Sequence, residues 1–111
     1  MKILGLAALS LFVATEAVAG ASNFTLVNGT QAALGAVQIR RAGTTQWKAL
    51  GNAPGAGAKS AMTFSDPDCA FDLQATVGGS AVTWAGVNLC DVKSVVLKHD
   101  PAAGAWVDYD Q

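Results

Sequence analysis

The stretch Cys69–Cys90, which reads CAFDLQATVGGSAVTWAGVNLC, decides the fold of this chain. Up to Val77, apolar residues alternate with mostly polar ones, and this period of two is typical of a strand with one buried face. Gly78-Gly79 supplies the positive φ angles that a tight hairpin turn needs, and alternation resumes on the way to Trp84. The stretch therefore predicts a β-hairpin with a cysteine at each end.

The two cysteines are the only ones in the 111-residue sequence, so they allow a single disulfide. If Val77 faced Val82 across a four-residue loop, Cys69 would lie opposite Cys90. Directly opposed Cβ atoms on paired strands are close enough for a disulfide. We therefore predict a Cys69–Cys90 disulfide that closes the hairpin.

The return strand of the hairpin changes its buried face part of the way along. Apolar residues occupy even positions at Val82 and Trp84 but odd positions at Val87 and Leu89. Such a switch predicts a β-bulge at Ala85-Gly86. Because a bulge there would move Cys90 off the face of Cys69 unless a second irregularity restores it, the local register stays open.

The first residues have the pattern of a secretory signal peptide. Lys2 is followed by an apolar run and by the small-residue cleavage motif Ala17-Val18-Ala19. We expect a signal peptide over residues 1–20, cleaved near Ala19–Ala21, with a cut before Gly20 and a cut after Ala21 both open. The apolar run is too short for a transmembrane helix, and no later stretch could span a bilayer. These features predict a periplasmic or secreted protein, in agreement with a disulfide.

After this leader, residues 21–111 are expected to form a single β domain. Short β-rich segments alternate with turn signals, which is typical of sandwiches and small barrels. Outside the hairpin these segments are Ser22–Val27, Gly35–Arg41, Thr44–Leu50 (a strand or one helical turn), Lys59–Phe64, Val92–His99 and Ala105–Tyr109. The sequence thus predicts an all-β fold, a small antiparallel β-sandwich of about seven short strands with one disulfide.

The charge pattern argues against two classes of partner. The formal net charge is −1 at pH 7, and the few basic residues form no extended patch in the sequence. We therefore do not expect binding to nucleic acid or to an anionic membrane surface. The pair Arg40-Arg41 is expected to be a solvated strand end.

Catalytic groups are scarce in the sequence. His99 is the only histidine, and no G-x-S-x-G motif is present. One histidine and two cysteines predicted to be oxidised cannot supply a zinc site. We therefore expect a protein that is not an enzyme and needs no cofactor.

Three aspartates are candidates for calcium binding. Asp66, Asp68 and Asp72 carry oxygen ligands of the kind that Ca²⁺ uses, although their spacing differs from that of an EF-hand. Asp66 and Asp68 flank a proline, a position where aspartate commonly stabilises a turn. Turn chemistry is therefore the first interpretation, and a calcium site is the alternative.

Three tryptophans are the largest apolar side chains of the predicted domain. Trp84 lies in the hairpin and is expected in the core. Trp47 follows polar residues and Trp106 lies near the end of the chain, so either could be partly exposed. A partly exposed tryptophan can serve as a platform for a sugar or a partner protein.

Several motifs of the chain resemble a group of small exported bacterial proteins of unknown function. They are Asn23-Phe-Thr-Leu-Val-Asn-Gly-Thr30, Trp47, Cys69-x-x-Asp-Leu73 and Trp84-x-Gly-Val-Asn-Leu-Cys90. In that group an F-x-L-x-N-x-T strand opens the domain and two cysteines bracket a hairpin. The resemblance covers most of residues 21–111, implies the fold alone and carries no catalytic residue onto this sequence. Asn23 and Asn28 also match the N-glycosylation pattern, but we interpret them as strand and turn residues.

Together these features predict an exported, non-enzymatic binding module of the bacterial envelope or secreted fraction. Its binding surface would be a sheet edge or the loops that carry Trp47 and the Gly- and Ala-rich segment Gly51–Ala58. The partner would be an unknown protein or a glycan. The alternative is a calcium-stabilised structural β domain that uses Asp66, Asp68 and Asp72.

Overall fold

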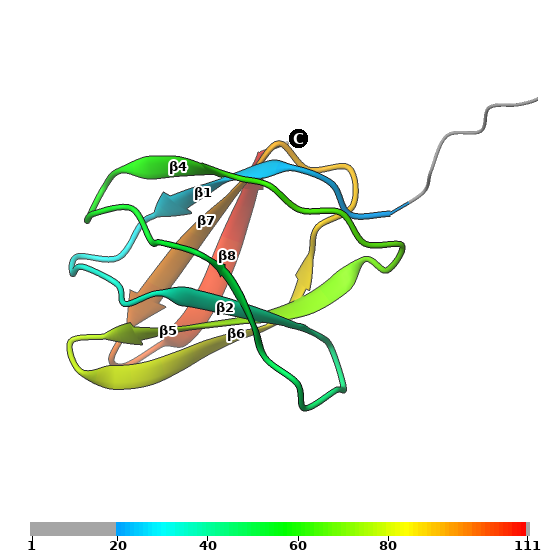
Figure 1. Cartoon of the computed structure of the whole chain (residues 1–111). Coiled ribbons are helices and arrows are strands. Elements are labelled where there is room, and N and C mark those ends of the chain that lie inside the picture. Colours follow the sequence, from blue (N-terminus) through cyan, green and yellow to red (C-terminus); the bar gives the residue numbers. More distant parts are fainter. Residues whose placement is uncertain (1–19, 111) are drawn as a thin grey trace, which may run out of the picture.

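The computed structural model describes residues 20–110, and in this range the chain forms eight β-strands and no helix (Figure 1). The strands are β1 (Phe24–Asn28), β2 (Val37–Arg41), β3 (Lys48–Gly51), β4 (Lys59–Met62), β5 (Ala70–Val77), β6 (Ser80–Asn88), β7 (Ser94–Asp100) and β8 (Gly104–Asp110). The all-β prediction is confirmed, with eight strands where about seven were expected. Apart from Gly20, the predicted signal peptide lies outside the described residues. Within residues 20–110, no helix is long and apolar enough to cross a membrane.

The strands form two four-stranded sheets that face each other (Figure 1). The β1 sheet has the order β4-β1-β7-β8, and the β5 sheet has the order β3-β2-β5-β6. All pairings inside the two sheets are antiparallel except that of β1 with β7, which is parallel. The predicted antiparallel sandwich is therefore confirmed with one exception. A parallel pair needs a long crossover, and here the whole β5 sheet separates β1 from β7 in the chain.

The core lies between the sheets and follows the alternation of the sequence. Phe24 and Leu26 on β1 and Val37 and Ile39 on β2 are buried, as their spacing predicts. The predicted core residue Trp84 is 1% exposed, and its indole Nε1 donates a hydrogen bond to the carbonyl of Lys98, 2.8 Å away in the facing sheet. A buried indole N–H usually needs such a partner.

The hairpin has a shorter turn than the register Val77–Val82 predicts. Val77 pairs with Ser80 and Ala75 pairs with Val82, so that prediction is wrong. The two-residue turn consists of Gly78 and Gly79, whose φ angles of 58° and 89° suit the primed turns that match the twist of paired strands.

The β-bulge at Ala85-Gly86 is confirmed. Leu73 pairs with Trp84 but Phe71 pairs with Val87, so two residues of β6 stand opposite one residue of β5. Gly86 has a φ of 66°, the left-handed conformation that glycine adopts most easily. The bulge moves the buried face of β6 from Trp84 to Val87.

The predicted disulfide between Cys69 and Cys90 is also confirmed, with a Cα–Cα distance of 5.1 Å. Beyond the bulge it is the N–H of Leu89, not of Cys90, that bonds to the carbonyl of Cys69, at 2.9 Å. Cys90 reaches Cys69 because β6 ends at Asn88, whose side chain accepts the N–H of Cys90 at 2.9 Å. The bulge alone would move Cys90 away from the face of Cys69, and this turn at Asn88 is the second irregularity that brings the two cysteines back together. A disulfide is compatible with an oxidising compartment.

Asn28 and Thr30 of the F-x-L-x-N-x-T strand are buried and joined by hydrogen bonds. The Asn28 side-chain oxygen accepts the Thr30 N–H at 3.0 Å and the Thr30 hydroxyl at 2.6 Å. The Asn28 amide nitrogen donates to the carbonyls of Ala32 at 3.0 Å and Pro54 at 3.1 Å. Asn28 thereby fastens two loops at once, the loop after β1 and the Gly- and Ala-rich connection between β3 and β4.

Candidate functional site

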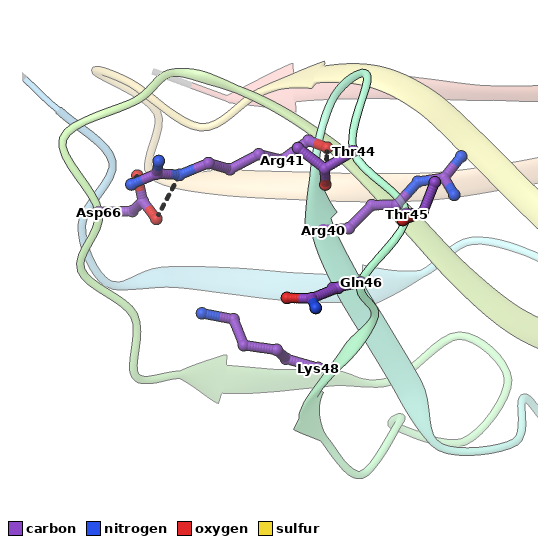
Figure 2. Close-up of a pocket in the computed structure, with 7 residues that line it drawn as sticks. All are labelled: Arg40, Arg41, Thr44, Thr45, Gln46, Lys48 and Asp66. Atoms are coloured by element: carbon purple, nitrogen blue, oxygen red, sulfur yellow. Dashed lines mark hydrogen bonds and ion pairs between the residues drawn. The ribbon is translucent and has the colours of Figure 1, made fainter.

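An open groove of about 490 Å³ lies where β2 ends and the chain turns toward β3 (Figure 2). We call it the Arg41 groove. The residues that line it are Arg40, Arg41, Thr44, Thr45, Gln46, Lys48 and Asp66. Three of the seven lysines and arginines of the sequence are in this set, so the groove concentrates hydrogen-bond donors in a nearly neutral chain.

The strand geometry places the two arginines on opposite sides of the β5 sheet. Successive side chains of a strand alternate between its faces. Arg41, the last residue of β2, is on the same side of the sheet as the buried Ile39, whereas Arg40 is on the outer side. The turn that follows, in which Gly43 has a φ of 83°, is closed by Thr44, whose N–H and hydroxyl both donate to the carbonyl of Arg41, at 3.1 and 2.7 Å.

Arg41 binds the two aspartates of the connection between β4 and β5. Its guanidinium nitrogens lie 3.1 Å from Asp66 Oδ1 and 3.1 Å from Asp68 Oδ2. Hydrogen bonding to Asp66 and the charges of both aspartates raise the pKa of Arg41. Burial raises the pKa of Asp66, but the N–H of Asp68 and the Arg41 guanidinium together outweigh it, so the pKa of Asp66 is lowered. One wall of the groove is thus fixed as a charged pair.

On the outer face of the β5 sheet, Arg40, which also lines the groove, contacts Asp72 and Trp47. Arg40 Nε donates to Asp72 Oδ2 at 2.9 Å, and the Arg40 guanidinium carbon lies 4.3 Å from the centre of the Trp47 ring. Asp72 Oδ1 accepts the N–H of Gly86 in the bulge at 3.0 Å. These contacts leave the Asp72 side chain 8% exposed, and the interpretation of Arg40-Arg41 as a plain solvated strand end misses them.

The structure does not assemble the three predicted calcium ligands into one site. Asp66 and Asp68 face Arg41, while Asp72 is bound to Arg40. In residues 20–110 no group of three or more His, Cys, Asp or Glu residues could hold a metal ion. Turn chemistry accounts for Asp66, because its Oδ1 accepts the N–H of Asp68 at 2.8 Å.

The two predicted binding tryptophans lie in different parts of the fold, one just before β3 of the β5 sheet and one in the β1 sheet. Trp47 is half-buried directly before β3, in contact with Arg40 of the groove wall. Trp106 is 41% exposed on β8, the edge strand of the β1 sheet, and pairs with Lys98. Only Trp47 is therefore next to the groove.

The lining of the groove is polar, and a small recess with apolar residues shares four of its residues. Figure 2 shows Gln46 and Lys48 extending toward the side on which Arg41 meets Asp66. The recess has a volume of about 20 Å³, and its lining adds Ile39, Phe64 and Phe71 to residues of the groove. Phe64 packs edge-to-face on Phe71 at 5.1 Å between ring centres.

Some groove residues were not named individually as binding residues from the sequence, although the loop that carries Trp47 was predicted as a binding surface; they are Thr44, Thr45, Gln46 and Lys48. The available signal was the polar run between Arg41 and Trp47. The Gly51–Ala58 segment, predicted as a possible binding loop, lines none of the groove.

Comparisons with protein-family models, with curated proteins and with solved structures give no match for this chain. The chemistry of the groove is therefore inferred from its own side chains.

Proposed function

We propose that the protein is an exported, non-enzymatic binding module of the bacterial envelope or secreted fraction, and that its ligand binds in the Arg41 groove beside Trp47. The observation that carries this proposal is the groove itself, an open hollow of about 490 Å³ whose lining residues are all polar or charged. Trp47, whose ring contacts Arg40, adds an aromatic surface beside these donors and acceptors.

The ion pairs around the groove support a ligand that is polar and not strongly charged. Arg41 is matched by Asp66 and Asp68, and Arg40 is matched by Asp72, so most of the positive charge is already balanced. What remains available are hydrogen-bonding groups such as the amide of Gln46 and the hydroxyl of Thr45. A glycan, or a polar segment of a partner protein, presents both donors and acceptors to such a surface.

The ion pairs also hold the site in shape before the ligand arrives. Side chains fixed by other residues lose little conformational entropy on binding. Arg41 is held by two carboxylates and by the turn at Thr44, and Trp47 rests on Arg40. This rigidity suits a binding module, whereas the calcium alternative has no assembled ligand set among residues 20–110 to support it.

The test is capture by the oxidised domain, immobilised and exposed to envelope extract, with Trp47→Ala compared to the wild-type protein. We expect Trp47→Ala to lose the captured ligand, and Trp106→Ala, which changes an exposed tryptophan on the other sheet, to keep it. Treating the extract with protease beforehand separates a glycan ligand from a protein ligand.

Each variant is first checked for folding by urea denaturation. Trp47 is half-buried and lies outside the buried core. Trp47→Ala loses the contact with Arg40, worth about 0.5–1 kcal/mol at an exposed site, and part of its apolar burial, and the domain should remain folded. Capture by Trp47→Ala at the wild-type level would refute a ligand site that includes Trp47 beside the groove.

A further inference from the structure

The first described residues are part of the folded domain. Ala21 is 4% exposed and forms isolated β-bridges with Asp66 and with Cys90. The N–H of Ala21 donates to the carbonyl of Asp66 at 2.8 Å, and the carbonyl of Ala21 accepts the N–H of Asp66 at 3.1 Å. Two residues that are distant in sequence are thus joined through Ala21.

The backbone of Gly20 lies so close to the same turn that a residue with a Cβ atom would clash there. A Cβ atom at this position would lie 2.5 Å from the carbonyl oxygen of Asp66 and 2.9 Å from the Cα of Pro67. Both neighbours are backbone atoms, so they cannot move aside as the end of a flexible side chain can. Glycine is the residue that permits such a close approach of two backbones.

These contacts distinguish the two possible cleavage sites of the leader. A cut between Ala19 and Gly20 keeps both residues in the mature protein. A cut after Ala21 removes them, leaves the backbone groups of Asp66 without these partners and frees the turn that carries the Arg41 ligands. Buried backbone groups that lose a hydrogen-bond partner destabilise a fold.

We infer that the peptide bond between Ala19 and Gly20 is the processing site that releases the mature domain. This inference rests on the export part of the proposed function. Hydrolysis of the bond consumes one water molecule and leaves a carboxylate on Ala19 and an amino group on Gly20. The small residues Ala17 and Ala19 have the spacing that a signal peptidase requires on the leader side of the bond.

The fold gives Gly20 and Ala21 a second role, which is to support the groove. Ala21 binds the backbone of Asp66, and the side chain of Asp66 binds Arg41. Processing at Ala19–Gly20 therefore leaves a mature N-terminus that lies beside the turn on which the groove depends.

The experiment is expression of the full chain in an exporting bacterium, followed by intact-mass measurement and N-terminal sequencing of the exported protein. We expect a product that begins at Gly20. A product that begins at Ser22 would overturn the inference and leave export intact. A chain that stays unprocessed inside the cell would overturn both this inference and the export proposal.

A variant of the leader gives a second test. Ala17 is required by a cut after Ala19 but lies too far away to matter for a cut after Ala21. We expect Ala17→Arg to abolish the product that begins at Gly20. Any product that begins at Ser22 instead should unfold at a lower urea concentration than the wild-type protein, and equal midpoints would contradict the role assigned to Gly20 and Ala21.

Discussion

At the scale of single residues, the buried polar groups explain why this small domain has a defined interior. Asn28, Thr30 and Asp72 are the polar residues buried within residues 20–110. In the same range, no buried side-chain nitrogen or oxygen lacks a hydrogen-bond partner. Because an unpaired polar group in the core is costly, these three residues favour one arrangement of the loops and sheets over others.

Asn28→Ala should strongly destabilise the domain. The substitution removes the side chain that joins the loop after β1 to the β3–β4 connection, and leaves the carbonyl of Pro54 without its donor. We expect a loss of about 2–4 kcal/mol in the free energy of unfolding, from lost hydrogen bonds and unpaired buried groups. Urea denaturation measures it. Asn23→Ala is the matched control, since Asn23 is exposed and accepts a single N–H, that of Phe64.

Asp72 should make the domain sensitive to acid. Burial raises the pKa of Asp72, but the N–H of Gly86 and the Arg40 guanidinium outweigh it, so its pKa in the folded protein is lower than in the unfolded chain. The carboxylate therefore stabilises the fold above about pH 4, the ordinary value for aspartate, and this contribution is lost as the pH falls through the lower folded value.

The comparison of the wild-type protein with Asp72→Asn over a pH series tests this linkage. The wild-type protein should be the more stable of the two near neutral pH, and its advantage should shrink as the solution becomes more acidic than about pH 4. Asp108→Asn, which changes an exposed aspartate on β8, is the control. An advantage over Asp72→Asn that stays constant down to pH 2 would show that the charge of Asp72 is not what stabilises the fold.

At the scale of elements, the β5–β6 hairpin joins the core to the groove. Its bulge turns Val87 inward and at the same point presents the N–H of Gly86 to Asp72, which holds Arg40. The bulge thus places Val87 in the core on one face of the sheet and holds the Asp72–Arg40 ion pair on the other face. Bulges are often found where a strand must redirect a side chain.

Gly86→Ala tests how much the bulge depends on its backbone conformation. A Cβ atom at Gly86 would meet nothing within 4 Å, so steric contact is not the reason for glycine there. The φ of 66° is the reason, and we expect Gly86→Ala to destabilise the domain by about 1–2 kcal/mol. Gly55→Ala is the control, since it also has open space and its φ lies outside the left-handed region. Equal urea midpoints for the two variants would contradict this explanation.

Local patterns in the sequence predicted the elements well because each depends on neighbouring residues. Alternation located the strands, Gly78-Gly79 located the turn, and the change from Trp84 to Val87 located the bulge. The groove was not predictable in this way. Arg40 pairs with Asp72 and Arg41 pairs with Asp66 across 32 and 25 residues of chain, and no local pattern reports which acid meets which base.

At the scale of the whole molecule, a few long-range contacts join the two small sheets at one end of the sandwich. The Cys69–Cys90 disulfide closes the β5–β6 hairpin there, and the bridges of Ala21, which lies just before β1, reach Cys90 and Asp66. Phe24 of the β1 sheet packs on Phe64, which packs on Phe71 of the β5 sheet, with ring centres 6.4 and 5.1 Å apart. The end of the sandwich beside the groove therefore carries several contacts that join the two sheets.

Removing the disulfide should lower stability without changing the fold. We expect the double variant Cys69→Ser, Cys90→Ser to lose about 3 kcal/mol in the free energy of unfolding, the amount typical for a loop of this size. Urea curves of the double variant and of the wild-type protein in reductant should coincide. If the oxidised wild-type protein gave that same curve, the disulfide would contribute nothing to stability.

The parallel pairing of β1 with β7 has a consequence for the order of events during biogenesis. Thr25 pairs with Ser94 and Asn28 with Leu97, so the central contact of the β1 sheet joins the two ends of the domain. Contacts between distant parts of a chain form late, because a long loop must close first. The β1 sheet therefore cannot be completed until β7 is available, whereas all four strands of the β5 sheet precede β7 in the chain and can pair before it. The topology thus favours an order of folding in which the β5 sheet forms first and the β1 sheet closes onto it.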